Sequence, residues 1–174
     1  AGAAGAGAFV LCNINFNREL LPPARETGKP VLTDVHTLSD PADAYNADFM
    51  SAADALFLSD ERLWAPPAEA ARELSERYGC RVVVVGLGAK GALLLEKGRS
   101  PVTVPAVRAR KVVSTIGAGD ALFSAFAHFH LAGRSAEESL RLATRFASWK
   151  IGETGAAAGF LSEAETLALK GEPS

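Results

Sequence analysis

A chain of 174 residues, of which 48% are hydrophobic and 22% charged, is long enough and apolar enough to bury the core of one globular domain. Its formal net charge is −2, whereas a surface that neutralises a phosphate backbone needs a clustered excess of Lys and Arg. Composition and charge therefore exclude a disordered or fibrous protein and argue against nucleic acid as a partner.

The amino-terminal segment and the cysteines indicate the class of protein. Residues 1–7 form an Ala/Gly segment of low complexity, so we place the folded domain at residues 8–170. The start of the chain has no basic region before its apolar residues, so it matches neither a signal peptide nor a membrane span. Cys12 and Cys80 lack the spacing of metal ligands or of a CxxC motif, and we interpret them as buried thiols. We expect a soluble, cytoplasmic protein with no membrane partner.

Four short apolar runs, separated by stretches of helical character, organise the first half of the chain. The runs lie at residues 8–14, 31–35, 55–58 and 82–85. Continuous apolarity over so few residues suits strands that are buried on both faces. Helices are expected between them, at about residues 17–27, 40–52 and 67–78. Because strand and helix alternate, the pattern predicts an α/β fold with a mostly parallel sheet.

The second half of the chain is richer in helices. Residues 92–96 and 102–104 are strand-like, and only a short turn-rich segment separates them, so we expect an antiparallel edge. A helix should follow at about residues 118–132, where apolar side chains share one face and Gly133 ends the helix. Two more helices are expected where a serine precedes a glutamate by three positions, at Ser135–Glu138 and Ser162–Glu165.

The segment Ser114–Phe123, with the sequence STIGAGDALF, carries the clearest chemical signal. It runs through small residues into the amphipathic helix. Gly117 and Gly119 allow the backbone to approach a ligand closely and to adopt φ angles that other residues avoid. The helix that they open offers free N–H groups and the positive end of its dipole, which suit an anion such as a transferring phosphoryl group. The sequence therefore predicts an anion site at this turn.

Asp120 lies in the first turn of the same expected helix, where the helix dipole favours its ionised form. A carboxylate beside an anion site can accept a proton from a hydroxyl group while that oxygen attacks phosphorus. A glycine-rich loop followed by an aspartate that merely caps a helix has the same sequence pattern. The pattern GAGD alone leaves both interpretations open.

Residues Thr115–Phe123 resemble the carboxyl-terminal signature of the ribokinase-like (PfkB-type) kinases. In that family the aspartate is the catalytic base and the GAG amides form the anion hole, so the resemblance implies these roles for Asp120 and for Gly117, Ala118 and Gly119. Residues 82–95, VVVVGLGAKGALLL, are similar to the family's ATP-contacting strand, turn and strand.

The resemblance extends over roughly residues 8–170 and implies a three-layer α/β fold that binds ATP with Mg²⁺ and phosphorylates a hydroxyl group of a sugar or nucleoside. It implies that the nucleotide contacts Thr115, Gly88, Ala89, Gly91, Gly155 and Ala156. Gly155 and Ala156 resemble the family's nucleotide-side loop. The family's amino-terminal substrate motif and its β lid, which often mediates dimerisation, would precede the matched segment. Without them we expect exposed apolar edges, so pairing with a second copy is one expected outcome.

The sequence departs from the family pattern at two polar sites. The family's Asn-x-x-Glu, which organises magnesium through water, would fall where this chain has Ser59 and Arg62. Asp60 or Glu61 is the expected substitute as the magnesium-side carboxylate. Ser114 stands where many members carry an aspartate beside a monovalent-cation site. These changes keep open an alternative, namely a catalytically weak nucleotide-binding or regulatory module with the same fold.

Other nucleotide-binding motifs are excluded by their context. Residues 86–91 match GxGxxG, but a strand pattern follows where a dinucleotide-binding motif would open a helix, and position 111 is Lys rather than an acidic residue. The chain contains no GxxxxGK[ST] motif, so it is not a P-loop enzyme. A vitamin kinase of the hydroxymethylpyrimidine type shares the fold and differs in its acceptor, so it remains a second alternative.

Overall fold

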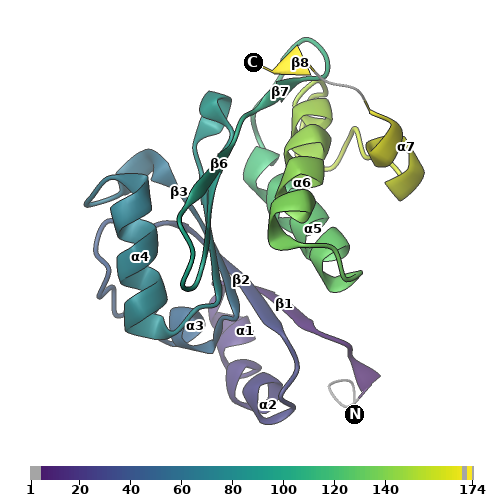
Figure 1. The fold of residues 1–174 in the computed structure, drawn as a ribbon. Coiled ribbons are helices and arrows are strands. Elements are labelled where there is room, and N and C mark those ends of the chain that lie inside the picture. The colour runs from purple at the N-terminus through teal and green to yellow at the C-terminus, as the bar shows by residue number, and fades with distance from the viewer. Residues whose placement is uncertain (1–4, 170–171, 174) are drawn as a thin grey trace. The chain divides into compact units, whose positions relative to one another are not determined.

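The structure is a computed structural model that describes residues 5–169 and 172–173. Its elements begin as alternating strands and helices, and helices predominate toward the carboxyl end (Figure 1). The described residues divide into two compact units. The first contains the chain up to Val85 together with Leu95–Pro101, and the second contains Gly86–Leu94 together with the chain from Val102 onward. None of the helices in the described part has the length and apolarity needed to cross a membrane.

One mixed sheet has its strands in the order β1-β2-β3-β4-β5-β6. Their bounds are β1 (Phe9–Cys12), β2 (Val31–Thr37), β3 (Ala55–Ser59), β4 (Val82–Gly86), β5 (Ala92–Glu96) and β6 (Val102–Val104). Strand β2 pairs in parallel with β1 and with β3, whereas β5 and β6 pair antiparallel, with Ala92 opposite Val104. The predicted mostly parallel sheet with an antiparallel edge is confirmed. Strands β2, β3 and β4 bury almost every side chain, as their continuous apolar runs indicated.

The helices of the first unit differ in how well the sequence placed them. Helix α4 (Pro67–Tyr78) has the predicted bounds, because a proline fits its first turn and Gly79 ends it in the left-handed conformation. The expected helix at residues 17–27 is instead two short helices, α1 (Asn15–Arg18) and α2 (Leu21–Glu26), and prolines begin the second of them.

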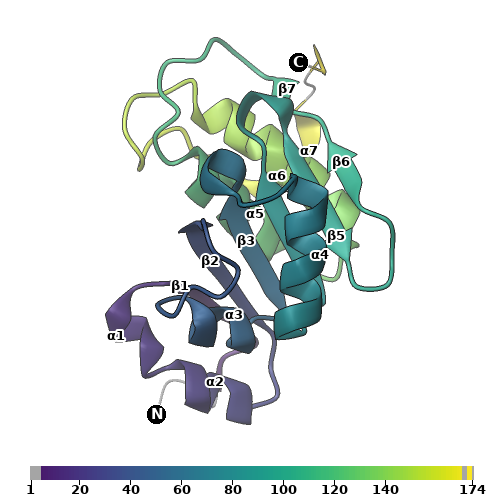
Figure 2. The ribbon, with the colours of Figure 1, turned by 90° about the vertical axis from the view of Figure 1, so that its left-hand side faces the viewer.

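Helix α3 is also shorter than expected. It spans only Ala47–Ala52, since residues 40–46 form turns in which aspartates replace helical hydrogen bonds. The Asp40 carboxylate accepts from the Ala42 N–H at 2.8 Å, and Asp43 accepts from the Asn46 N–H at 2.9 Å. Helix α3 packs against β2, α2 and α4 (Figure 2).

The second unit is built around two long helices, α5 (Ala118–Leu131) and α6 (Ala136–Lys150), which pack against each other. It also contains β6 and the first three residues of β5, together with a 3₁₀ turn, η3 (Gly88–Lys90), the short strands β7 (Val107–Arg108) and β8 (Glu172–Pro173), and helix α7 (Glu163–Ala168). Both predicted serine caps are present, and in α7 the serine and the glutamate cap each other reciprocally. The hydrogen bonds from Ser162 lower the pKa of Glu165.

Strand β1 lies at one edge of the sheet, and apolar side chains on it and in the segment that follows it are exposed. Val10, Ile14 and Phe16 are 46%, 47% and 73% exposed. The edge position also explains why Cys12 is partly exposed, so its interpretation as a buried thiol is wrong. Cys80 is buried as expected, and burial raises the pKa of its thiol to about 11.

Candidate active site

The turn that leads into α5 has the tight geometry that its glycines predicted. Gly117 precedes the helix in the left-handed conformation, with φ 78° and ψ 11°. The Ala118 N–H donates to the carbonyl of Thr115 at 3.0 Å, and the Ala121 N–H donates to the carbonyl of Gly117 at 3.0 Å. The Ile116 N–H donates to the Ser114 hydroxyl at 3.3 Å. The turn is therefore held by its own hydrogen bonds.

Three backbone amides of this turn are left without an internal acceptor. Within residues 5–169 and 172–173, no hydrogen bond is donated by the N–H of Gly117, Gly119 or Asp120. They stand at the start of a 14-residue helix, whose dipole adds positive potential. Ala118 differs from them, because its N–H is used inside the turn. The amides of Gly117, Gly119 and Asp120 can therefore bind an anion without breaking an existing bond.

The carboxylate of Asp120 is exposed beside these amides, in the first turn of α5. Among the described residues it forms no ion pair and accepts no side-chain hydrogen bond, so its oxygens remain available to a ligand. A carboxylate that only capped the helix would accept from a backbone N–H of the first turn, and the residue that occupies the cap position is Gly117, which has no side chain. Asp120 is therefore not the residue that caps α5.

The loop after α6 contacts the same turn. Gly155 and Ala156, which the resemblance placed on the nucleotide side, lie in this loop. A Cβ added to Gly117 would be 3.1 Å from both Cα and Cβ of Ala156. The structure thus brings together two segments that are about forty positions apart in the sequence, and it explains why position 117 requires a residue without a side chain.

Lys150 joins the two loops, and sequence reasoning missed it. It is the last residue of α6 and its exposed fraction is 0%. Its Nζ donates to the carbonyl of Gly155 at 2.7 Å and also to the carbonyl of Ile116. A Cβ on Gly117 would lie 3.3 Å from this ammonium group. One signal for its burial was present, because position 150 follows the buried Ala143 by seven residues, or two helical turns.

The turn between β4 and β5 contains the other predicted nucleotide residues, Gly88, Ala89 and Gly91. It is closed by a hydrogen bond of 2.8 Å from the Leu87 N–H to the carbonyl of Gly91. Strand β5 follows directly, so the rejection of a dinucleotide-binding motif is confirmed. Gly88 and Ala89 are exposed, whereas Gly91 is buried. No hydrogen bond among the described residues joins this turn to the turn before α5.

The predicted magnesium-side carboxylates, Asp60 and Glu61, lie in the 3₁₀ turn η2 (Asp60–Arg62) at the carboxyl end of β3, in the first unit. The Ser59 hydroxyl caps this turn by accepting from the Glu61 N–H at 3.3 Å. In the described part of the chain, no three acidic, His or Cys side chains gather into a metal-binding group. Carboxylate oxygens such as those of Asp60 and Glu61 are ligands of the type that Mg²⁺ takes, either directly or through water.

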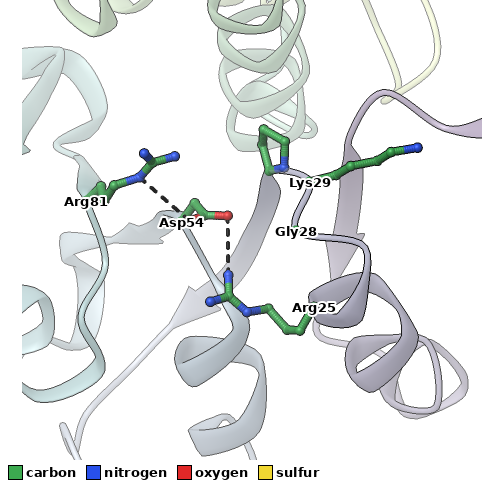
Figure 3. Close-up of a pocket in the computed structure, with 6 residues that line it drawn as sticks. Arg25, Gly28, Lys29, Asp54 and Arg81 are labelled. Atoms are coloured by element: carbon green, nitrogen blue, oxygen red, sulfur yellow. Dashed lines mark hydrogen bonds and ion pairs between the residues drawn. The ribbon is translucent and has the colours of Figure 1, made fainter.

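A hollow of about 320 Å³ in the first unit lies away from the carboxyl ends of its strands (Figure 3). It is lined by Arg25, Gly28, Lys29, Pro30, Asp54 and Arg81. The Asp54 carboxylate accepts from the Val31 N–H at 2.9 Å and pairs with Arg25 and Arg81 at 3.4 and 3.7 Å. This network lies at the amino ends of the strands, opposite to the carboxyl ends at which parallel sheets bind ligands.

Residues 18–163 match the family described as pfkB family carbohydrate kinase. The chain belongs to this family. Ribokinase of Arabidopsis thaliana is 30% identical to it over 148 residues, which are 82% of this chain and 39% of that relative. The resemblance inferred from Thr115–Phe123 is thereby confirmed.

Solved structures of small-molecule kinases share the fold. A microbiome-derived acarbose kinase, Mak1, superposes with a TM-score of 0.88 at 24% identity, over 97% of this chain and 57% of that one. Arabidopsis thaliana ribokinase complexed with ribose and ATP superposes with a TM-score of 0.79 at 26% identity, over 94% and 55% of the two chains. The chain therefore spans less than two thirds of each of these kinases and forms part of their fold.

Proposed function

We propose that this chain is the nucleotide- and phosphoryl-binding part of a cytoplasmic kinase that transfers a phosphoryl group from ATP to a hydroxyl group of a sugar or related small molecule. The observation that carries this proposal is the start of α5, where unpaired amides stand next to an available carboxylate, Asp120. The relative solved with ribose and ATP supports both the donor and the class of acceptor. Composition supports a small acceptor rather than nucleic acid.

In the proposed reaction, Asp120 takes the proton of the acceptor hydroxyl as its oxygen attacks the γ-phosphorus of ATP. The bond between that phosphorus and the bridging oxygen of ADP breaks, and ADP leaves with the electron pair. Negative charge that develops on the transferring group faces the turn Gly117–Gly119 and the positive end of α5. The amides are fixed before the reaction by the turn, so they need no reorganisation when the charge appears.

The nucleotide is proposed to lie against two segments of the second unit. Gly88, Ala89 and Gly91 would line one side, and Thr115 with the Gly155–Ala156 loop would line the other. Mg²⁺, when bound, would neutralise phosphate charge, and Asp60 or Glu61 would hold it through water. The exposed apolar edge at β1 is the surface on which the remainder of a kinase or a second copy of the chain would pack.

The catalytic assignment is tested by Asp120→Asn in the longest natural chain that contains residues 1–174. The amide keeps the shape of the side chain but cannot accept the proton, so kcat should fall by about 10² or more. The affinity for ATP, measured by calorimetry, should stay within a few fold. Glu76→Gln is the matched control, because it removes an exposed carboxylate on α4 and should change neither quantity.

The same experiment separates the kinase from the regulatory alternative, which the residues Ser59, Arg62 and Ser114 favour. A module that only binds nucleotide would bind ATP but phosphorylate none of a panel of sugars and nucleosides. In that case Asp120→Asn would change neither ATP binding nor any measurable activity. A large loss of ATP binding in the variant would identify Asp120 as a structural residue instead. Turnover of a hydroxymethylpyrimidine rather than a sugar would establish the vitamin kinase.

A further inference from the structure

Lys150 carries a charge into a place where a charge is costly. Its side chain is completely buried, and within the described residues no carboxylate forms an ion pair with it. Its two hydrogen-bond partners are both backbone carbonyl oxygens. An ammonium group without a counter-ion loses much of its solvation energy on burial, and a methionine would fill similar space without that cost. The position is therefore one where the positive charge itself has a use.

The two carbonyls identify what the charge acts on. One belongs to Gly155, in the loop after α6, and the other to Ile116, in the turn before α5. The Val113 and Ser114 N–H groups both donate to the carbonyl of Ile151, at 2.8 and 3.0 Å, so the same two segments are also joined by their backbones. The ammonium is the only side-chain group among the described residues that hydrogen-bonds to both loops.

The bond to Ile116 has an electronic consequence for the next residue. The carbonyl of Ile116 and the N–H of Gly117 belong to one peptide group. A donor bound to the oxygen of a peptide polarises it and makes its N–H a stronger donor. The N–H of Gly117 is one of the three amides that have no internal acceptor. Lys150 thus binds the oxygen of this peptide group, and the N–H of the same group has no protein acceptor and is left for a ligand.

We propose that Lys150 is a positioning residue of the anion site, an internal cation that fixes the turn before α5 against the Gly155 loop and polarises the Gly117 amide toward a phosphoryl group. The inference rests on the proposed kinase function for the identity of the anion. The ligand class is a phosphoryl group, because three amides and a nearby ammonium offer donors and positive potential, and Ala156 limits the space beside them. Lys150 acts through the backbone and need not touch the substrate.

The test compares two substitutions in the longest natural chain that contains residues 1–174. Lys150→Met removes the charge and keeps the volume, whereas Lys150→Ala removes both and leaves room between the two carbonyls for a small cation. Both should lower kcat by about 10- to 100-fold, the scale seen when a group that orients an active-site residue is lost, with KM for the acceptor little changed. Lys97→Met, an exposed lysine, should have no effect.

Rescue separates a charge effect from a loss of packing. Added ammonium, methylammonium or potassium should restore activity to Lys150→Ala in a saturable way and should not restore it to Lys150→Met, in which the methionine fills the space. Tetramethylammonium is the control for ionic strength. Failure of all small cations to rescue the alanine variant, or wild-type kcat in either variant, overturns the proposal.

Hydrogen exchange provides a readout that does not need turnover. In Lys150→Ala the amides of Val113, Ser114 and Ala118 should exchange faster, and methylammonium should slow them again. If the wild-type protein neither binds nor hydrolyses ATP, the proposed function fails, while the role of Lys150 is still decided by this exchange and by the protection that inorganic phosphate gives to residues 114–121. Exchange that is equal in wild type and variant refutes the role of Lys150 in either case.

Discussion

Two glycine-rich turns of the second unit have similar sequences and different reasons for their glycines. In the turn at residues 86–91, a Cβ on Gly91 would lie 2.1 Å from the carbonyl oxygen of Val104, so the backbone of a neighbouring strand excludes a side chain. In the turn at residues 114–120, a Cβ on Gly119 would meet nothing within 4 Å. The first turn needs a glycine for packing, and the second keeps one where no packing demands it.

The hydrogen bonds of the two turns also differ, although both turns leave backbone donors unused. In the first turn, Leu87 and Gly91 donate to carbonyls within the turn, and the N–H groups of Gly88 and Ala89 have no acceptor among the described residues. The second turn leaves the amides of Gly117, Gly119 and Asp120 unpaired in the same part of the chain. The second turn alone of the two opens a long helix, and a buried lysine binds its carbonyl at Ile116. Glycine spacing and unused donors are thus common to both turns, and the helix start with its internal cation sets the second apart.

The largest effect that the comparison predicts is on stability, for Gly91→Ala. The new Cβ would clash with backbone atoms of Val104 and Ala106, and the φ of 100° is strained for any other residue. We expect a loss of at least about 3 kcal/mol in the free energy of unfolding, which is a large fraction of the roughly 5–15 kcal/mol that stabilises a typical domain. Thermal and urea unfolding measure it.

Gly88→Ala is the matched control in the same turn. Its φ of 56° is left-handed, but a Cβ there meets nothing within 4 Å. Only the conformational cost remains, about 1–2 kcal/mol. If Gly91→Ala destabilises the protein no more than Gly88→Ala does, the packing explanation for the first turn is wrong.

The second prediction, for Gly119→Ala, reverses the pattern. Alanine in the first turn of α5 should leave stability unchanged or raise it by up to about 1 kcal/mol, because glycine is the poorer helix former. The methyl group would crowd an anion bound to the neighbouring amides, so kcat should fall by about tenfold or more. Ser124→Ala, an exposed change on the same helix, controls for helix propensity and should leave kcat unchanged. Full activity in Gly119→Ala would contradict the proposal that the anion binds at this turn.

The parts of the fold that the sequence predicted are those in which local chemistry agrees with packing. Helix α4 has proline in its first turn and Gly79 after its end, and its bounds are as expected. The helix predicted at residues 40–52 begins later than expected, because Asp40 and Asp43 fold residues 40–46 into turns that an apolar pattern does not reveal. The sheet order could not be read from the strands themselves, since identical apolar runs fit several orders.

The candidate site was predictable in its backbone and not in its buried charge. Gly117, Gly119 and Asp120 could be predicted from their residue types and from their position at the start of a helix. Lys150 is the last residue of a helix, and a lysine normally faces solvent. Its burial depends on the loop at Gly155 folding over it, which is a tertiary contact between segments that no local pattern connects. A charged residue at a position that continues the buried stripe of a helix is the sequence signal that indicates such a buried charge.

The smallest effect that we predict is the activation of the wild-type protein by potassium, which should be weak or absent. A monovalent cation near the second turn would need carbonyl oxygens and a balancing negative charge. The carbonyls of Ile116 and Gly155 are already bound by Lys150, and Ser114 offers a neutral hydroxyl where a carboxylate would balance the charge. Potassium that finds no binding site on the protein cannot favour an active conformation and so cannot raise the rate. Initial rates are compared in potassium and in tetramethylammonium at one ionic strength, with ATP and magnesium fixed. Strong, saturable activation would mean that other oxygens build a cation site and that the second turn does not carry its own charge.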